Sequence, residues 1–423
     1  MRKYKLGDIA TVEISGVDKK IKDGEEEIRL CNFVDVYYNW AITMARHDSF
    51  MLATARPNEV SKFQLKKGQV ALTKDSETRD DIGISTYIAD DFDDVILGYH
   101  CALITPNKDI LDGRYLNALL HTGYAKKYFA YNASGSGQRY ALSVETLNSF
   151  PVPVIPLQKQ KQIGEIFSAL DKKIELNKQI NQNLEAMAKQ LYDYWFVQFD
   201  FPDENGRPYK SSGGRMVWNE KLKREIPENW HSDSVCLIAD ILSGGTPSKR
   251  INEYWNYGHI PFFGPTDYNG SMFQLQTADK ITESGLQHCS SSLFEENTII
   301  ITARGSIGKL VIVGTPMAMN QSCYALKSKN KEYEYLYFLT IQLIESLKAK
   351  GSGSVFKSII ASDIENTMLC VANKESISLF CDKASPIMKQ IKKNTQEIIH
   401  LTKQRDDLLP LLMNGQVSVN SDL

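Results

Sequence analysis

The sequence lacks any apolar run that approaches the length of a membrane span, and its first residues, MRKYKLGDIA, become polar too early for a signal peptide. Its seven cysteines, at positions 31, 101, 236, 289, 323, 370 and 381, form no C-x-x-C pair, and no two histidines stand at metal-ligand spacing. We therefore expect a protein of the reducing cytoplasm, with neither a disulfide framework nor a metal site.

An excess of either charge is also missing. The formal net charge is only -2, so a role in nucleic-acid binding cannot rest on overall basicity and needs lysines and arginines at particular places. The 42% hydrophobic and 24% charged residues are ordinary for a globular protein, and 423 residues are enough for about two or three domains.

The sequence also lacks catalytic motifs. An adenine methyltransferase needs an Asn or Asp followed by two prolines and an aromatic residue, and the sequence contains no such run. The segment ARGSIGKLV has a Gly-Lys pair, but Leu310 stands where a phosphate-binding loop needs Ser or Thr. Gly305 and Gly308 therefore indicate a tight turn between strands. We find no candidate catalytic residue and predict that the chain is not an enzyme.

What the sequence does contain is a long heptad seam. Ten positions from Ile163 to Trp195 alternate steps of four and three, and eight of them are apolar. The seam consists of Ile163, Phe167, Leu170, Ile174, Asn177, Asn181, Leu184, Ala188, Leu191 and Trp195. A buried amide favours only those helix registers that give it a hydrogen-bonding partner, so the two asparagines are predicted to fix the register.

A second seam of the same kind lies near the other end of the chain. It consists of Phe380, Ala384, Ile387, Ile391, Asn394, Ile398, Leu401, Arg405, Leu408 and Leu412, again with eight apolar members. If the two helices pair antiparallel, their midpoints coincide and Asn394 meets Asn177 and Asn181. The alternative is two unrelated amphipathic helices, each covering its own domain.

These helices divide the chain. Residues 1–155 combine strand-like runs such as QVALT and CALIT with Gly and Asp turns and a helical stretch from about Tyr115 to Ala130, which indicates an α+β domain. A spacer helix at 156–200 and a linker at 201–230, identified by its Pro, Gly and Ser content, precede a second α+β domain at 231–372. A C-terminal spacer helix at 373–423 completes the predicted organisation.

The two α+β domains repeat one another. LGDIATVEISG at Leu6 aligns with CLIADILSGG at Cys236, and GQVALT at Gly68 aligns with NTIIIT at Asn297 at the same offset of about 229. HCALI then matches CYALK, and SGSG at Ser134 matches GSGS at Gly351. The predicted fold is therefore two similar α+β domains separated by a long antiparallel two-helix coiled coil, with internal pseudo-two-fold symmetry.

The second half contains GGTPSKRINEYWNYGHIPFF, ITESGLQHCSSSLF, IIITARGSIGK and NQSCYAL in that order, preceded by YDYWFVQFDFP and EIPENW. With these motifs the chain strongly resembles the specificity subunit of type I restriction-modification systems. The first half departs from this pattern, because it has KDSETRDDIG where the second half has ARGSIGK. Domains that read different sequences are expected to differ in this way.

The resemblance implies a non-catalytic DNA-recognition subunit. Each domain would read one half of a bipartite, asymmetric target in double-stranded DNA, and the two helices would set the spacer and dock two methyltransferase (modification) subunits. Restriction and translocase subunits would join through that complex, and S-adenosylmethionine, ATP and magnesium would belong to the partner subunits. The alternative function is a protein-protein scaffold with two similar binding heads on a coiled-coil ruler.

Candidate DNA-binding residues are Lys, Arg and polar residues beside glycines or aromatic residues, because base edges and phosphates need such donors. They are Lys74, Arg79, Gln138, Arg139 and Tyr140 in the first domain, and Lys249, Arg250, Arg304, Lys309 and Lys357 in the second. For each one, the alternative is an ordinary solvated surface residue. Tyr194, Trp195 and Phe196 are too many large rings for one seam, so they are predicted to pack on the adjacent domain or on a partner subunit.

Overall fold

The computed structural model describes residues 2–135, 137–350 and 358–417. The chain divides into two compact units, unit 1 (Met1–Glu175 with His400–Leu423) and unit 2 (Leu176–Ile399). Each unit therefore contains one predicted α+β domain together with part of each long helix, so the units are larger than the predicted domains. No helix in the described ranges is long and apolar enough to cross a membrane.

Unit 1 is built on a five-stranded sheet in the order β2–β10–β6–β8–β4. The strands are β2 (Ala10–Ile14), β10 (Cys101–Pro106), β6 (Val70–Thr73), β8 (Ser85–Ile88) and β4 (Ala41–Ile42). All neighbours are antiparallel except β4 and β8, which are parallel. The predicted strands QVALT and CALIT are therefore β6 and β10, which are adjacent at the centre of this sheet.

Both faces of this sheet are covered, which explains why β6 is apolar at successive positions. Val70 and Leu72 pack with Tyr115 of α4 (Gly113–Leu120), whereas Ala71 packs toward Ile28 of a second sheet. That sheet has the order β5 (Met51–Ala55), β3 (Glu26–Cys31) and β9 (Val95–Leu97). The helical stretch predicted as one element is two helices, because Thr122 caps the start of α5 (Gly123–Asn132).

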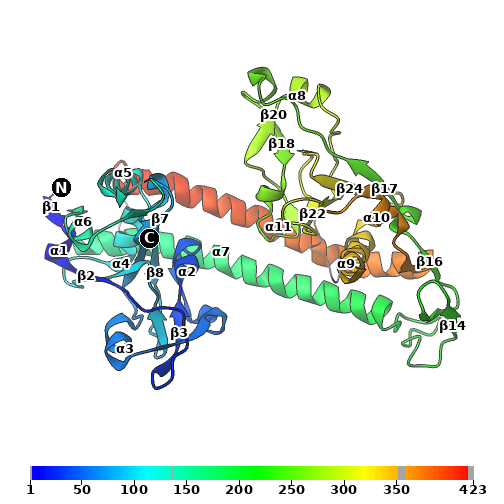
Figure 1. Ribbon diagram of the computed structural model, residues 1–423, viewed down its shortest axis with the longest axis horizontal. Coiled ribbons are helices and arrows are strands. Elements are labelled where there is room, and N and C mark those ends of the chain that lie inside the picture. The colour runs from blue at the N-terminus through cyan, green and yellow to red at the C-terminus, as the bar shows by residue number, and fades with distance from the viewer. Residues whose placement is uncertain (1, 136, 351–357, 418–423) are drawn as a thin grey trace. The chain divides into compact units, whose positions relative to one another are not determined.

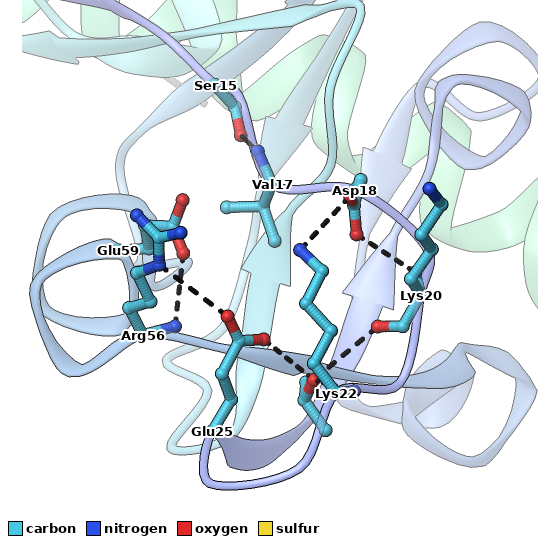
Figure 2. Close-up of polar contacts among 9 residues, drawn as sticks. Ser15, Val17, Asp18, Lys20, Lys22, Glu25, Arg56 and Glu59 are labelled. Atoms are coloured by element: carbon cyan, nitrogen blue, oxygen red, sulfur yellow. Dashed lines mark hydrogen bonds and ion pairs between the residues drawn. The ribbon is translucent and has the colours of Figure 1, made fainter.

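The loop between β2 and β3 folds back onto β5. Thr54 accepts a hydrogen bond from the backbone of Lys22 and donates one to Glu25, while the Lys22 ammonium lies 3.2 Å from Asp18. Figure 2 shows these side chains together with Arg56, whose guanidinium is 3.6 Å from Glu25. Within the loop between β2 and β3, Lys22 is thus paired with the nearby carboxylate of Asp18, and Glu25 connects the loop to Thr54 of β5.

Unit 2 repeats the strand order of unit 1. Its five-stranded sheet has the order β17 (Ala239–Ser243), β24 (Cys323–Ser328), β21 (Ile299–Thr302), β22 (Leu310–Val313) and β19 (Phe273–Gln274), with β19 and β22 parallel. A second sheet has the order β20 (Asp279–Ile281), β18 (Ile260–Phe263) and β23 (Ala318–Met319), and its β18–β23 pair is parallel like β3–β9. The predicted duplication is therefore confirmed strand by strand.

The core of unit 2 also follows unit 1. Ile299 and Ile301 of β21 pack with Leu336 of α9 (Tyr333–Lys350), and Ile300 packs with Phe263 of the second sheet. The aligned residues Gly68 and Asn297, each two positions before its central strand, share a left-handed backbone with φ of +98° and +69°. The smaller helices of the two units are α1 (Leu6–Ile9), α2 (Phe33–Tyr37), α3 (Pro57–Phe63), α6 (Val144–Asn148), α8 (Glu283–Gln287) and α10 (Ala361–Asn366).

In each unit a short strand pair joins the start and the end of the α+β domain. In unit 1, β1 (Arg2–Lys5) pairs antiparallel with β13 (Pro151–Val154). In unit 2, β16 (His231–Asp233) pairs antiparallel with β25 (Leu369–Val371). Both domains are thus closed by a strand pair just before the chain enters a long helix.

The long helices are α7 (Leu157–Tyr192) and α11 (Lys374–Met413). All twenty predicted seam positions are buried or partly buried. In unit 2 the two helices lie side by side (Figure 1), with Tyr192 against Phe380 and Asn181 against Asn394, so the residue numbers run in opposite directions. In unit 1, Phe167 of α7 belongs to the same buried cluster as Leu412 of α11. The predicted antiparallel pairing is confirmed within each unit.

The asparagines behave as predicted except for one. Asn394 donates from Nδ2 to Asn181 Oδ1 over 2.9 Å, and Asn181 Nδ2 lies 3.2 Å from Thr395 Oγ1. Asn177 is buried, but within the described residues its Nδ2 has no hydrogen-bond partner. Among the described residues Asn394 is thus hydrogen-bonded to Asn181 and not to Asn177, because positions one helical turn apart are about 5–6 Å from each other.

The predicted linker is an ordered part of unit 2. It contains a hairpin of β14 (Met216–Asn219) and β15 (Arg224–Pro227), in which Met216 pairs with Pro227. Phe201 stacks between Tyr209, at 4.6 Å, and Trp230, at 4.8 Å between ring centroids. These aromatic contacts anchor the segment between α7 and the second α+β domain to the core of unit 2.

Candidate nucleic-acid interface

The candidate site of unit 1 starts at the end of β6, where Thr73 fixes the base of a loop. Gly83 donates its backbone N–H to the Thr73 carbonyl over 3.0 Å, and Ile84 donates to the Thr73 hydroxyl over 3.0 Å. Gly83 has φ +80° and its missing Cβ would meet the Phe129 ring at 2.4 Å, so glycine is required there. Residues 74–82 form the loop above this base.

Two more segments of unit 1 join the same loop. Lys74 donates its backbone N–H to the carbonyl of His100, and Leu142 donates to the carbonyl of Lys74, both over 2.8 Å. His100 directly precedes β10, and Leu142 follows the small-residue segment at 134–137. The loop, the start of β10 and the residues before Leu142 therefore form one surface.

Unit 2 has the same construction. Gly308, with φ +75°, donates to the Thr302 carbonyl over 2.8 Å, which confirms the predicted turn between strands. Ala303 donates to the carbonyl of Ser322 over 2.8 Å, and Ile359 donates to the carbonyl of Ala303 over 2.9 Å. The backbone bonds match those of unit 1, whereas the loop is shorter and carries different side chains.

All five DNA-binding candidates of unit 1 fall on this surface. A three-stranded sheet of β11 (Ser134–Gly135), β12 (Tyr140–Ala141) and β7 (Asp75–Ser76) links the two segments that contain them. Tyr140 pairs with Ser76, and the Arg79 guanidinium lies 5.0 Å from the centre of the Tyr140 ring. Arg79, Gln138 and Arg139 are exposed. The structure thus brings together Lys74, Arg79, Gln138, Arg139 and Tyr140.

An ion-paired cluster lies at the centre of this surface. Asp75 is 2.8 Å from the Lys74 ammonium and 2.5 Å from His100 Nδ1, and an Arg139 guanidinium nitrogen is 3.1 Å from His100 Nε2. Burial alone would raise the pKa of Asp75, but the hydrogen bonds from Lys74 and His100 outweigh burial and lower it. Asp75 is therefore a carboxylate at neutral pH, and it orients both basic neighbours.

Beside this cluster is an open pocket of about 720 Å³, which the sequence did not indicate. Helix α2 supplies one wall, where the Phe33 and Tyr37 rings lie 5.6 Å apart and the Tyr37 and Tyr38 rings 4.8 Å apart. Tyr38 is 75% exposed. The remaining lining residues are Val34, Asp75, Ser76, Glu77, Thr78, Asp81, His100, Gln138 and Arg139.

The candidates of unit 2 fall into two groups. Arg304 and Lys309 are exposed on the loop above Thr302, and the Lys309 ammonium lies 5.4 Å from the Tyr268 ring centre. Lys249 and Arg250 are exposed on the segment after β17, where Lys249 is 3.7 Å from Asp279. Lys357 lies outside the described residues.

The two groups meet through backbone and side-chain contacts between their segments. Gly245 donates its N–H to the carbonyl of Met319 over 3.0 Å, and Thr246 is hydrogen-bonded to Gln321. The segment 319–322 in turn holds Ala303 through Ser322. Within the described ranges, no hydrogen bond or ion pair joins Lys249 or Arg250 to Arg304 or Lys309 directly.

Lys348 is a basic residue that sequence reasoning missed. It is exposed on α9, and its Nζ lies 3.7 Å from the position that a Cβ on Gly308 would occupy. The available signal was its place shortly before the small-residue segment at 351–354. Arg304, Lys309 and Lys348 therefore give this loop three cationic side chains.

Of the two alternatives for the three aromatic residues, packing within the chain is the one observed for Trp195 and Phe196, so their listing as partner-binding residues is corrected. Trp195 and Phe196 are 6% and 2% exposed, and Phe196 contacts the rings of Tyr335 at 4.9 Å and Trp230 at 5.5 Å. They lie in a π-helical turn (Asp193–Val197), whose wider repeat lets two consecutive residues face the core. Tyr194 is 37% exposed and stays a prediction.

Within the described part of the chain, no group of three or more His, Cys, Asp or Glu side chains could hold a metal ion. The seven cysteines are free thiols. The chemistry that the surfaces offer is hydrogen bonding, charge and aromatic contact.

Comparison with known proteins identifies relatives of this chain. Residues 1–186 and 227–403 match the family described as type I restriction modification DNA specificity domain. The chain is 25% identical over 408 residues to the type I restriction enzyme HindI specificity subunit of Haemophilus influenzae, with 84% of this chain and 88% of the relative covered. It is 27% identical over 318 residues to the MjaIX specificity subunit of Methanocaldococcus jannaschii, with 74% and 71% covered.

A solved structure has the same fold. The crystal structure of the type I restriction-modification system S subunit from M. genitalium superposes with a TM-score of 0.57 and 14% sequence identity, covering 97% of this chain and 95% of the other.

Proposed function

The chain belongs to the type I restriction-modification DNA specificity family, whose members are non-catalytic DNA-recognition subunits, and we propose that each unit reads its half of a bipartite target with the loop surface described above. The observation that carries this proposal is the duplicated loop base. Thr73 and Thr302 anchor equivalent loops with equivalent hydrogen bonds, yet the loops differ in length and in exposed side chains. A constant support for variable side chains suits two surfaces that read different base sequences.

Charge placement supports DNA contact at these surfaces despite the net charge of -2. Arg304 and Lys309 are exposed on the unit 2 loop, and the Lys348 ammonium of α9 lies beside Gly308 of the same loop. Such donors suit phosphate oxygens, which position a protein on the duplex. In unit 1, Arg79 and Arg139 are exposed beside the pocket and suit the same task.

We also propose that α7 helps to bind two methyltransferase (modification) subunits. Leu176, Ile180, Met187 and Tyr194 are spaced by four, seven and seven residues, which places them on one helix face. They are 55%, 37%, 56% and 37% exposed, and the last two border an open groove of about 680 Å³. An exposed apolar stripe on an otherwise polar helix is typical of a protein interaction site.

The cofactors follow from this arrangement as a proposal. S-adenosylmethionine, ATP and magnesium would bind to the methyltransferase and to the restriction and translocase subunits that join through the complex. The loop surfaces of this chain supply donors and charges for DNA, which is the part of the task that the specificity subunit performs.

The test compares variants of the two loops on duplexes with one half-site altered at a time. Arg139→Ala is expected to change discrimination at the unit 1 half-site alone, and Arg304→Ala at the unit 2 half-site alone, by about 1–3 kcal/mol each if they contact bases. Lys108→Ala, an exposed lysine of unit 1 outside this surface, is the matched control and should bind like the wild type. Loop variants that bind every duplex like the wild type would contradict the proposal.

A further inference from the structure

The pocket of unit 1 differs in character from the basic loop of unit 2. Three carboxylates line it, from Asp75, Glu77 and Asp81, together with aromatic side chains of α2. Arg139 also lines the pocket, but one guanidinium against three carboxylates makes the pocket less favourable for a DNA phosphate than the basic loop of unit 2, because like charges at short range raise the energy of binding. The pocket is therefore a poor place for the DNA backbone and a better one for the edge of a base.

Two of the three carboxylates already have partners. Asp75 is engaged by Lys74 and His100, and Asp81 accepts hydrogen bonds from the Tyr37 hydroxyl at 2.7 and 2.9 Å. Glu77 is exposed, and no hydrogen bond or ion pair of its side chain occurs among the described residues. Glu77 thus presents an uncommitted acceptor at the pocket wall.

The lining residues other than the carboxylates suit a flat ligand. Tyr38 and Val34 are 75% and 54% exposed, so the wall formed by α2 offers apolar surface to solvent. Gln138 is exposed on the lining as well, and a side-chain amide can pair with an adenine edge. The pocket thus has one apolar and aromatic wall, and the rest of its lining is polar.

We infer that this pocket takes the edge of a base with an exocyclic amino group, cytosine or adenine, and that the amino group donates a hydrogen bond to the Glu77 carboxylate. The inference rests on the proposed function, since it assigns a ligand to the same surface. An ionised carboxylate only accepts hydrogen bonds, and the amino groups of cytosine and adenine are the donors that the major groove offers. Glu77 is then a specificity-determining residue of the first half-site.

The experiment removes one amino group at a time from the DNA. The full-length chain is titrated with duplexes in which a single cytosine of the unit 1 half-site is replaced by pyrimidin-2-one, or a single adenine by purine. At one position the wild type should lose about tenfold in affinity. The Glu77→Ala variant should bind the unmodified duplex about tenfold more weakly and show no further loss at that position.

Glu27→Ala is the matched control, because it removes an exposed carboxylate of unit 1 outside the pocket lining. It should keep the wild-type response to every modified base. If Glu77→Ala binds all duplexes more tightly and still discriminates at the amino group, Glu77 only repels the backbone and the inference is overturned. A third outcome is that Arg139→Ala changes discrimination at the unit 1 half-site, but Glu77→Ala abolishes the effect of no modified base. The inference about Glu77 then fails, while the proposed function stands.

Discussion

At the residue scale, one hydrogen-bonded pair, Asn181 with Asn394, joins α7 and α11 in unit 2 and is predicted to fix their register. Asn181→Leu would leave the buried Asn394 amide without its acceptor and should lower the free energy of unfolding by about 1–3 kcal/mol. The double variant Asn181→Leu with Asn394→Leu should recover most of this loss, because apolar residues can replace a buried polar pair. Denaturant unfolding of Asn181→Leu, Asn394→Leu and the double variant measures the coupling. A double variant whose loss equals the sum of the single losses would show that the pair does not act as a unit.

His121 makes the stability of unit 1 dependent on pH. Its ring stacks on Trp40 at 4.3 Å and lies 2.9 Å from the Ser85 carbonyl, and burial lowers its pKa to about 4. Between this value and the unfolded pKa of about 6.5, the unfolded chain binds the proton more readily. The stabilisation that depends on neutral His121 is therefore fully present above pH 6.5. As the pH falls from 6.5 to 4, it is lost, and the free energy of unfolding decreases by about 3 kcal/mol.

The check is the pH dependence of unfolding for His121→Phe, which keeps an aromatic ring against Trp40 and cannot titrate. Its stability should fall less steeply between pH 6.5 and 4 than that of the wild type. An identical slope in the two proteins would assign the pH dependence to other groups.

The cations around the unit 2 loop should be visible in the salt dependence of binding. Lys309→Ala and Lys348→Ala are each expected to reduce the slope of log affinity against log salt by about 0.9, and to weaken binding to all sequences alike. Lys383→Ala, an exposed lysine on α11, serves as the control and should keep the wild-type slope. If the slope of log affinity against log salt is unchanged in Lys309→Ala and Lys348→Ala, these lysines do not contact DNA phosphates.

Candidate site residues could be selected from the sequence where a local pattern marks them. Arg139 and Arg304 stand beside glycine-rich segments, and the structure places both on the duplicated surface. His100 and Tyr38 were not predictable, because the fold brings them to this pocket from segments far apart in the sequence. Trp195 and Phe196 were assigned in part to a partner because helical periodicity gives no sign of a π-helical turn.

At the element scale, the two long helices were the most predictable part of the chain. Their seams are fixed by a repeat that depends only on side-chain spacing, and positions such as Leu184 and Ile398 are partly or fully buried as expected. The segment at 201–230 was the least predictable. The Pro, Gly and Ser content predicts turns, but it does not predict the stacking of Phe201 on Trp230.

The helices also allow a test of the spacer function. Four extra residues beside Asn181 and four beside Asn394 should lengthen the helix pair by about 6 Å and nearly preserve the seam. With base pairs about 3.4 Å apart, the gap between half-sites should grow by about one to two base pairs, with both half-sequences unchanged. Two extra residues in each helix should instead rotate one end of the seam into solvent and destabilise the fold.

The measurement is the methylated motif in a host that carries each variant together with its methyltransferase subunits. The two-residue variant should unfold more easily than the four-residue variant, which tests whether the seam has to stay in register. A four-residue variant that is folded and active but keeps the original gap would show that the helices do not set the spacer.

At the scale of the whole molecule, the duplication predicts modular recognition. Exchanging residues 1–155 for the corresponding domain of a relative should change one half of the methylated motif and leave the other half and the spacer unchanged. The exchange ends directly after β13, which completes the domain by pairing with β1. Sequencing of methylated bases in the host gives the result, and a change in both halves would contradict independent reading by the two units.

The strand pair β16–β25 also bears on how the chain finds its fold. Residues 198–373 separate the end of the π-helical turn from the start of α11, so closing the helix pair of unit 2 first would immobilise a very long loop. Once His231 pairs with Val371, only residues 198–231 and 371–373 still span the gap, about one fifth of that length. Loop-closure entropy grows with the logarithm of length, so this shortening lowers the cost of closure by about 1.4 kcal/mol. A chain that folds its domain before its helices therefore meets the smaller entropic barrier.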